Sequence, residues 1–211
     1  MLRLTEKQQA FILLSLFYIG WTKFPIEGDN IYLADYCLRI VMLAFIWQER
    51  HVIIKKAVWP PFYMWLVFGL FLLAYLIVND AIYQFDIAYY INDYLYETAS
   101  YPAIEDPLLL VFDMSIGLVF VAITEEYLFR YKLDRVFKKA GCSTLLRCFL
   151  TSILFATIHA PQGLISLLET FLWGVFLFVL YQRSRSLQFV MVLHFIVNFS
   201  AFGLLALQKE W

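Results

Sequence analysis

The chain has 211 residues, of which 63% are hydrophobic and 19% aromatic, and its mean hydropathy is +0.72. A soluble domain of this length would not be so apolar, and the hydrophobic residues form long blocks rather than amphipathic stripes. We therefore predict an all-α fold, a polytopic transmembrane helical bundle without a separate soluble domain. The net charge is −1, and no nucleic-acid-binding footprint is present, so we expect no nucleic-acid partner.

The hydrophobic blocks predict about seven transmembrane helices. Six of them cover approximately residues 9–24, 31–47, 61–78, 144–160, 164–181 and 187–207. The fourth in chain order starts near residue 108 and includes residues 124–130. No small-residue cleavage site follows the first block, so we expect no cleavable signal peptide. The cysteines (Cys37, Cys142 and Cys148) have no metal-type spacing and are predicted to be packing residues rather than disulfide partners.

Charged residues within and between the blocks give further expectations. Asp35 and Arg39 are four apart in the second block, so they share a helix face and are expected to neutralise each other. Residues 80–107 are acidic and rich in tyrosine, and their 82–96 stretch predicts a helix in the membrane interface. Apolar residues recur at helical spacing after residue 130, so we expect the fourth helix to continue beyond the membrane. We expect it to stop at Gly141.

The basic segments set the predicted orientation. With seven crossings they all fall on one side of the membrane, and the acidic loop falls on the other. These segments are Arg3/Lys7, 50–56, 130–139 and Arg183/Arg185. By the positive-inside rule the basic side is cytoplasmic, which predicts a cytoplasmic N-terminus. The small size and the absence of organelle signals favour a bacterial or archaeal plasma membrane.

Two adjacent carboxylates, Glu125 and Glu126, lie at the end of the fourth apolar block, with Arg130 close behind. Ionisable groups inside a membrane are costly and are usually retained for a function. Glu126 and Arg130 are four apart and can pair, whereas Glu125 points about 100° away around the helix. Glu125 is therefore the candidate for chemistry. The alternative, that both carboxylates only anchor the helix end with Arg130, stays open at this point.

His159 and His194 lie in apolar blocks. A lone histidine in a membrane helix more often joins two helices than catalyses, but here the glutamates and Asn198 accompany the two histidines. His194 and Asn198 are one helical turn apart on the same face. Glu125 and His159 are equally distant from Cys142, in the turn between their helices, so antiparallel packing places them at the same height.

The spacing of the motifs does not determine how deep such a site lies in the membrane. The turn at 161–163 places His159 near the outer end of its helix, whereas Glu125 lies in the inner part of its own. Either the helices extend into the cytoplasm, or the outer turn is sunken into the membrane.

Three motifs follow one another along the chain: Glu125-Glu126-x-x-x-Arg130, Phe155-x-x-x-His159 and His194-x-x-x-Asn198. Together, over about residues 108–203, they resemble the CPBP family of intramembrane proteases. This family includes CAAX-processing enzymes and bacteriocin-processing or immunity proteins. The resemblance implies a catalytic transmembrane core at 108–211, in the C-terminal four helices. Residues 1–107 are then N-terminal transmembrane helices plus the acidic extracytoplasmic loop.

The resemblance also implies roles for the motif residues. Glu125 would be the general base that activates water, assisted by His159, and His194 with Asn198 would stabilise the oxyanion. Peptide hydrolysis needs an activated water and donors aimed at the developing oxyanion, which is consistent with these roles. No serine or cysteine is placed to act as a nucleophile.

Supporting roles fall to Glu126 and Arg130, which would hold the site together, and to Phe155. Tyr131 stands where many family members have glycine, a change that bears on substrate class more than on the chemistry. A glutamate with two histidines could also bind zinc, because both side chains are ordinary zinc ligands. The chain has no His-Glu-x-x-His motif, so we favour a mechanism without metal or other cofactor over the zinc-dependent alternative.

The predicted activity is hydrolysis of a peptide bond near the terminus of a membrane-associated protein or peptide, with the lipid bilayer as the other partner. Three substrate classes stay open: prenylated C-termini, leader peptides and bacterial C-terminal sorting signals. A competing hypothesis is a non-enzymatic immunity or scaffold protein that retains the fold. Another is a proton-coupled transporter, which should show an inverted repeat or paired broken helices, and neither is visible.

Overall fold

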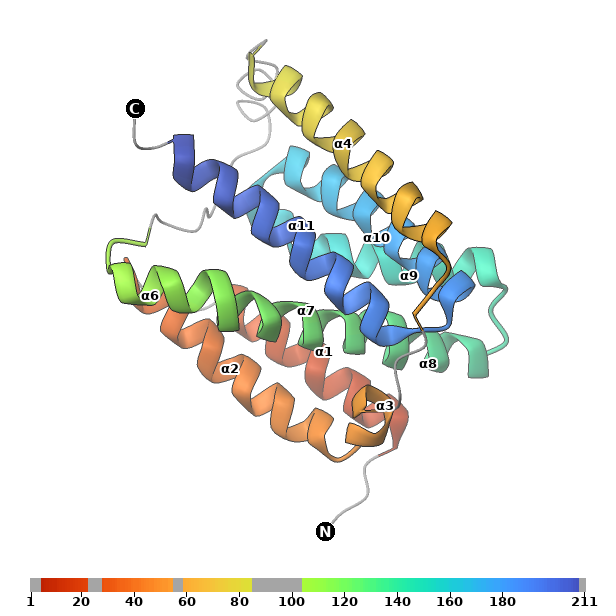
Figure 1. The fold of residues 1–211 in the computed structure, drawn as a ribbon. Helices are drawn as coiled ribbons and strands as arrows, with labels where there is room; N and C mark the ends of the chain where they lie inside the picture. The colour runs from red at the N-terminus through yellow and green to blue at the C-terminus, as the bar shows by residue number, and fades with distance from the viewer. Residues whose placement is uncertain (1–4, 23–27, 55–58, 85–103, 209–211) are drawn as a thin grey trace.

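A computed structural model of the protein describes residues 5–22, 28–54, 59–84 and 104–208 (Figure 1). All regular elements in these ranges are helices, which confirms the predicted all-α fold. In chain order they are α1 (Glu6–Thr22), α2 (Asn30–Trp47), α3 (Arg50–Ile54), α4 (Phe62–Gln84), α6 (Pro107–Phe112), the π-helix η1 (Asp113–Gly117), α7 (Leu118–Glu126), the π-helix η2 (Tyr127–Leu133), α8 (Asp134–Lys139), α9 (Thr144–Thr157), the 3-10 turn η3 (Ala160–Gln162), α10 (Leu164–Ser184) and α11 (Leu187–Gln208).

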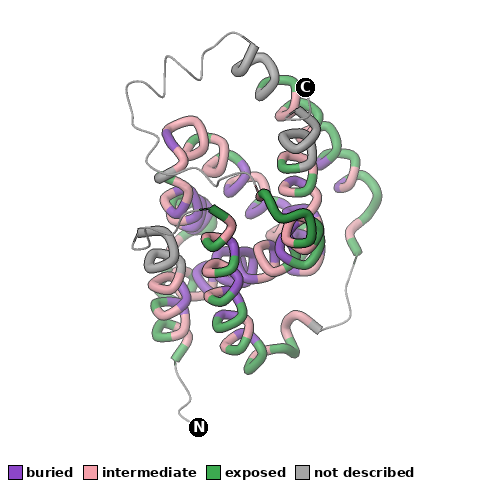
Figure 2. Tube along the Cα trace, turned by 90° about the vertical axis from the view of Figure 1, so that its left-hand side faces the viewer, coloured by how far each residue is buried: buried purple, intermediate pink, exposed green. Residues whose placement is uncertain are grey.

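Each predicted transmembrane segment coincides with a helix. Among the described residues, Asn30–Trp47, Pro107–Lys139 and Leu164–Ser184 are long and apolar enough to cross a membrane, and α4, α9 and α11 contain shorter apolar stretches. Figure 2 shows buried residues in the centre of the bundle and exposed ones along its outer helices, where many large apolar side chains lie. The chain is thus a helical membrane bundle. A further helix was predicted over residues 82–96. Its residues 85–96 lie outside the described part of the chain.

The fourth predicted helix is one continuous helical run of 33 residues, Pro107–Lys139. Asp106 caps its start, because its side chain accepts hydrogen bonds from the backbone N–H groups of Leu108 and Leu109 at 2.7 and 3.2 Å. Gly141, with a φ of 83°, ends the run as expected. At 1.5 Å per residue the run is about 50 Å long, more than the ~30 Å hydrocarbon core of a bilayer. Its length therefore supports the alternative in which helices extend beyond the membrane.

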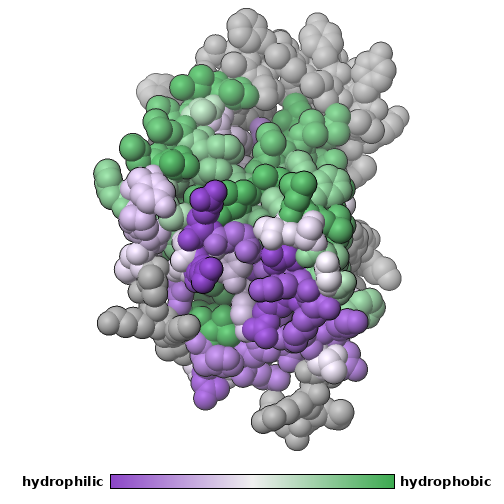
Figure 3. Space-filling model, turned by 90° about the vertical axis from the view of Figure 1, so that its right-hand side faces the viewer, coloured by the Kyte–Doolittle hydropathy of each residue, from purple (hydrophilic) through white to green (hydrophobic). Residues whose placement is uncertain are grey.

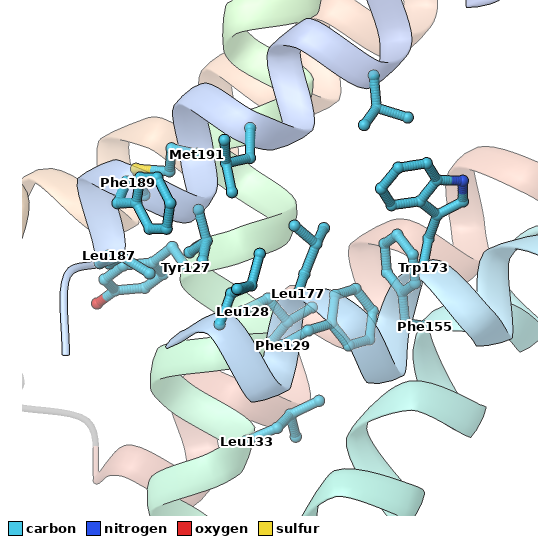
Figure 4. Close-up of a cluster of buried hydrophobic side chains, with 14 of the residues drawn as sticks. Tyr127, Leu128, Phe129, Leu133, Phe155, Trp173, Leu177, Leu187, Phe189 and Met191 are labelled. Atoms are coloured by element: carbon cyan, nitrogen blue, oxygen red, sulfur yellow. The ribbon is translucent and has the colours of Figure 1, made fainter. Parts of the chain in front are cut away.

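The run 107–139 connects the two halves of the bundle (Figure 1). Its α7 segment packs against α2 and against α11, while α1 packs against α2 and η2, and α9 against α10. A buried apolar cluster joins η2 to α9, α10 and α11 and includes Phe129, Phe155, Leu177 and Phe189 (Figure 4). Side chains of α7 and η2 can therefore meet residues from both ends of the chain.

Described residues of three predicted basic segments make contacts at one end of the bundle. Lys139 of α8 pairs with Glu6 at the start of α1 at 2.5 Å, and Lys132 pairs with Glu49, directly after α2, at 2.5 Å. The hydrogen bond from Lys139 holds the pKa of Glu6 below its usual value. The start of α11 is hydrogen-bonded to α3. Figure 3 shows polar side chains gathered on the lower part of one face, below an apolar region.

Helices α9 and α10 approach each other closely at Ser152 and Gly174. A Cβ atom added at Gly174 would lie 3.0 Å from Ser152 Cβ and 3.1 Å from Ser152 Cα. These separations are shorter than ordinary contacts between carbon atoms. Because Ser152 Cα belongs to the backbone, a larger residue at 174 can be accommodated only if the two helices move apart.

We expect Gly174→Ala to lower the free energy of unfolding by about 1–3 kcal/mol, the usual cost of overpacking a well-packed interior. Thermal unfolding of the purified protein in detergent measures this change. Gly69→Ala on α4 is the matched control, because a Cβ there meets no atom of the described residues within 4 Å. Equal unfolding midpoints for the two variants would contradict the close approach of α9 and α10.

Candidate active site

The two adjacent glutamates end α7 and point into the bundle. Glu125 is 3% exposed and Glu126 0%, and Arg130 in η2 is also 0% exposed. The α-helix gives way to the π-helix η2 directly after Glu126, and single π-helical turns occur frequently at functional sites. Charges buried to this extent are tolerated only when other groups compensate them. The partners of the two carboxylates therefore define the site.

Glu126 has two partners. Arg130 Nε lies 3.1 Å from Glu126 Oε2, which is the contact predicted from their spacing. The guanidinium of Arg130 also lies over the ring of Phe155, with its central carbon 4.9 Å from the ring centroid. His194 Nδ1 lies 2.8 Å from Glu126 Oε1. Because a carboxylate only accepts, Nδ1 carries the proton in that hydrogen bond.

His194 lies between the two carboxylates instead of facing Glu125 alone. Its Nε2 atom lies 3.7 Å from Glu125 Oε2, beyond hydrogen-bond distance, while Nδ1 bonds Glu126. Glu125 Oε2 is buried and has no hydrogen-bond partner among the described residues. The sequence prediction grouped His194 only with Glu125. The structure adds that Glu126 fixes the orientation of its ring.

Glu125 has a partner that the sequence analysis did not foresee. Arg39 Nη2 of α2 lies 3.1 Å from Glu125 Oε1, and Arg39 Nη1 donates to Thr124 Oγ1 at 2.8 Å. The predicted pair with Asp35 is also present, at 2.5 Å from Arg39 Nε to Asp35 Oδ2. An arginine carries five N–H donors, so a buried one needs more acceptors than one carboxylate one turn away. Arg39 has more N–H donors than Asp35 can accept, and this excess was the one indication in the sequence of a further partner.

His159 and Phe155 come from the end of α9. His159 Nδ1 lies 3.0 Å from the Phe155 carbonyl oxygen, and because that oxygen only accepts, Nδ1 carries the proton and Nε2 has the acceptor role. The Phe155 ring meets the His159 ring edge to face at 5.0 Å and the His194 ring at 5.9 Å. His159 is also close enough to Glu125 to interact with it electrostatically.

Asn198 lies one turn beyond His194 on α11 and is half-buried. Its side chain makes no hydrogen bond to another described residue. The structure thus gathers Glu125, Glu126, Arg130, Phe155, His159 and His194 into one cluster. It places Asn198 on the same helix face as His194. Within the described ranges, no group of three or more His, Cys, Asp or Glu side chains is arranged to hold a metal ion.

The helical membrane bundle thus gathers two buried glutamates and two histidines in one site, as the resemblance to an intramembrane protease implied. Residues 107–200 match the protein-family model described as Type II CAAX prenyl endopeptidase Rce1-like. This range contains all three motifs and begins after α2. The match confirms the resemblance to the CPBP family of intramembrane proteases that the three motifs indicated. No curated protein and no solved structure matched the chain.

We expect Arg130→Gln to lower the free energy of unfolding by about 3–5 kcal/mol, because it leaves the carboxylate of Glu126 buried without its arginine. Chemical or thermal unfolding in detergent measures the change. Arg135→Gln, five residues further on, is the control: its side chain is 43% exposed and pairs with Glu6. Loss of such a surface pair costs about 0–1 kcal/mol. Similar losses in the two variants would contradict the burial of the Arg130 pair.

Proposed function

We propose that the protein is an intramembrane endopeptidase that cleaves near the C-terminus of a prenylated, CAAX-type protein or peptide. The family match supports the reaction class and suggests the substrate class, since the matched family is described by CAAX prenyl endopeptidase activity. The observation that carries the proposal is the pair of buried glutamates, one at 2.8 Å and one at 3.7 Å from the same histidine. A site of this kind can hold and deprotonate a water.

The proposed reaction starts at Glu125 Oε2. This oxygen takes a proton from a water, and the water oxygen forms a bond to the carbonyl carbon of the scissile peptide. The protonated Glu125 then delivers its proton to the leaving nitrogen as the C–N bond breaks, so the carboxylate is regenerated. His159, which interacts electrostatically with Glu125, would assist this transfer. The second hydrogen of the water stays on the new carboxyl group, so the products are a carboxylic acid, which then ionises by releasing that proton, and a free amine.

The tetrahedral intermediate carries an oxyanion that needs donors. Asn198 supplies a side-chain N–H, and His194 in its protonated form donates at both nitrogens. Glu126 bonds His194 Nδ1, so it holds the ring that faces the reacting atoms. Arg130 in turn neutralises Glu126, and Phe155 supports both histidine rings and the guanidinium.

We expect Glu125→Gln to abolish cleavage of a fluorogenic farnesylated CAAX peptide by the purified protein in liposomes. Removal of a general base costs about 10²–10⁴-fold in rate. Glu169→Gln is the matched control, because Glu169 lies in another membrane helix, where it accepts a hydrogen bond from the Tyr75 hydroxyl at 3.4 Å. Preserved cleavage by folded Glu125→Gln would rule out the glutamate mechanism.

We also propose that cleavage needs no metal ion. Treatment of the reconstituted protein with a strong zinc chelator, followed by removal of the chelator–metal complex, should leave the cleavage rate unchanged. The same peptide assay measures this. Activity that disappears with the chelator and returns on adding zinc would contradict the metal-free proposal and favour a zinc-dependent protease.

A further inference from the structure

Arg39 connects the N-terminal helices to the chemistry of Glu125. It lies on α2, outside the matched family region, and is 4% exposed. Each of its three guanidinium nitrogens has a different acceptor: Nε bonds Asp35, Nη1 bonds Thr124 and Nη2 bonds Glu125. Each nitrogen therefore has an acceptor within the protein. This arrangement suits Arg39 to hold Asp35, Thr124 and Glu125 in place.

The contact with Glu125 uses one carboxylate oxygen and leaves the other. Oε1 is 3.1 Å from Arg39 Nη2, whereas Oε2, which has no hydrogen-bond partner among the described residues, lies 3.7 Å from His194 Nε2. Holding Oε1 fixes the rotation of the carboxylate about its last bond. The direction in which Oε2 presents its lone pairs then depends on Arg39.

Simple charge neutralisation does not explain the Thr124 contact. Asp35 alone balances the charge of Arg39, and its side chain is 21% exposed, at the edge of the interior. Thr124 precedes Glu125 in the chain, and its hydroxyl also donates to the Phe120 carbonyl of the same helix at 2.7 Å. Bonds from one planar guanidinium to two consecutive residues of α7 therefore set the guanidinium plane relative to the helix that carries the base.

We propose that Arg39 is a positioning residue of the hydrolytic reaction: it holds Glu125 Oε1 so that Oε2 faces the attacking water and His194. This inference rests on the proposed function. It assigns a part of the site to α2, which supplies none of the three motifs. Errors of about 1 Å in the placement of a reacting group cost on the order of 10²-fold in rate.

The test compares Arg39→Gln and Arg39→Lys with the wild-type protein in liposomes, using the farnesylated CAAX peptide as probe. For Arg39→Gln we expect kcat to fall about 10²-fold with KM within about twofold of wild type, because the base is misplaced while peptide binding is unaffected. Arg39→Lys keeps the charge but lacks the planar fork, so it should recover about a tenth of wild-type kcat. Rates are normalised to folded protein.

Arg147→Gln is the control for the loss of a buried arginine. Arg147 is similarly buried and pairs with Asp134 at 2.5 Å, but it belongs to the polar end of the bundle. It should lower the unfolding midpoint without changing kcat per folded molecule. Wild-type kcat in Arg39→Gln, or an equal loss of kcat in Arg147→Gln, would overturn the positioning role and leave the proposed function intact. Failure of the wild-type protein to cleave the probe would overturn the proposed function itself.

Discussion

The buried ion pair between Arg39 and Glu125 is the interaction on which the arrangement of the site depends. A carboxylate in an apolar bundle needs a compensating charge, and Glu125 finds its nearest one on α2. The pair joins α2 to α7. Helix α7 also packs against α11, which carries His194. One electrostatic requirement thus connects the start of the chain to the helix with the last motif.

The same requirement explains why Glu125 and Glu126 behave differently although they are neighbours. Glu126 is bonded at one oxygen by His194 and lies against Arg130 at the other, so both oxygens are engaged. Glu125 is held at Oε1, and Oε2 is the oxygen that can take part in a reaction. The residues directly after them form a π-helix, which alters the rotation of the following side chains relative to an α-helix.

Hydropathy and spacing predicted the helices, the Glu126–Arg130 pair and the Asp35–Arg39 pair, because all of these depend on local sequence. The contact between Arg39 and Glu125 joins residues 86 apart and depends on how α2 packs against α7. The local partner Asp35 already satisfied the i, i+4 pattern, and the surplus N–H donors of Arg39 indicated a further acceptor without identifying it. Likewise, whether His194 bonds one glutamate or reaches both depends on the rotation of α11, which periodicity does not determine.

Arg39 and Glu125 should be energetically coupled across the two parts of the chain. A double-mutant cycle on the free energy of unfolding in detergent, with Arg39→Gln, Glu125→Gln and the combined variant, measures that coupling directly. Contacting charged residues give interaction energies of about 0.5–3 kcal/mol, and a buried pair belongs in the upper part of that range. Effects that add to within about 0.5 kcal/mol would show that the two side chains do not meet.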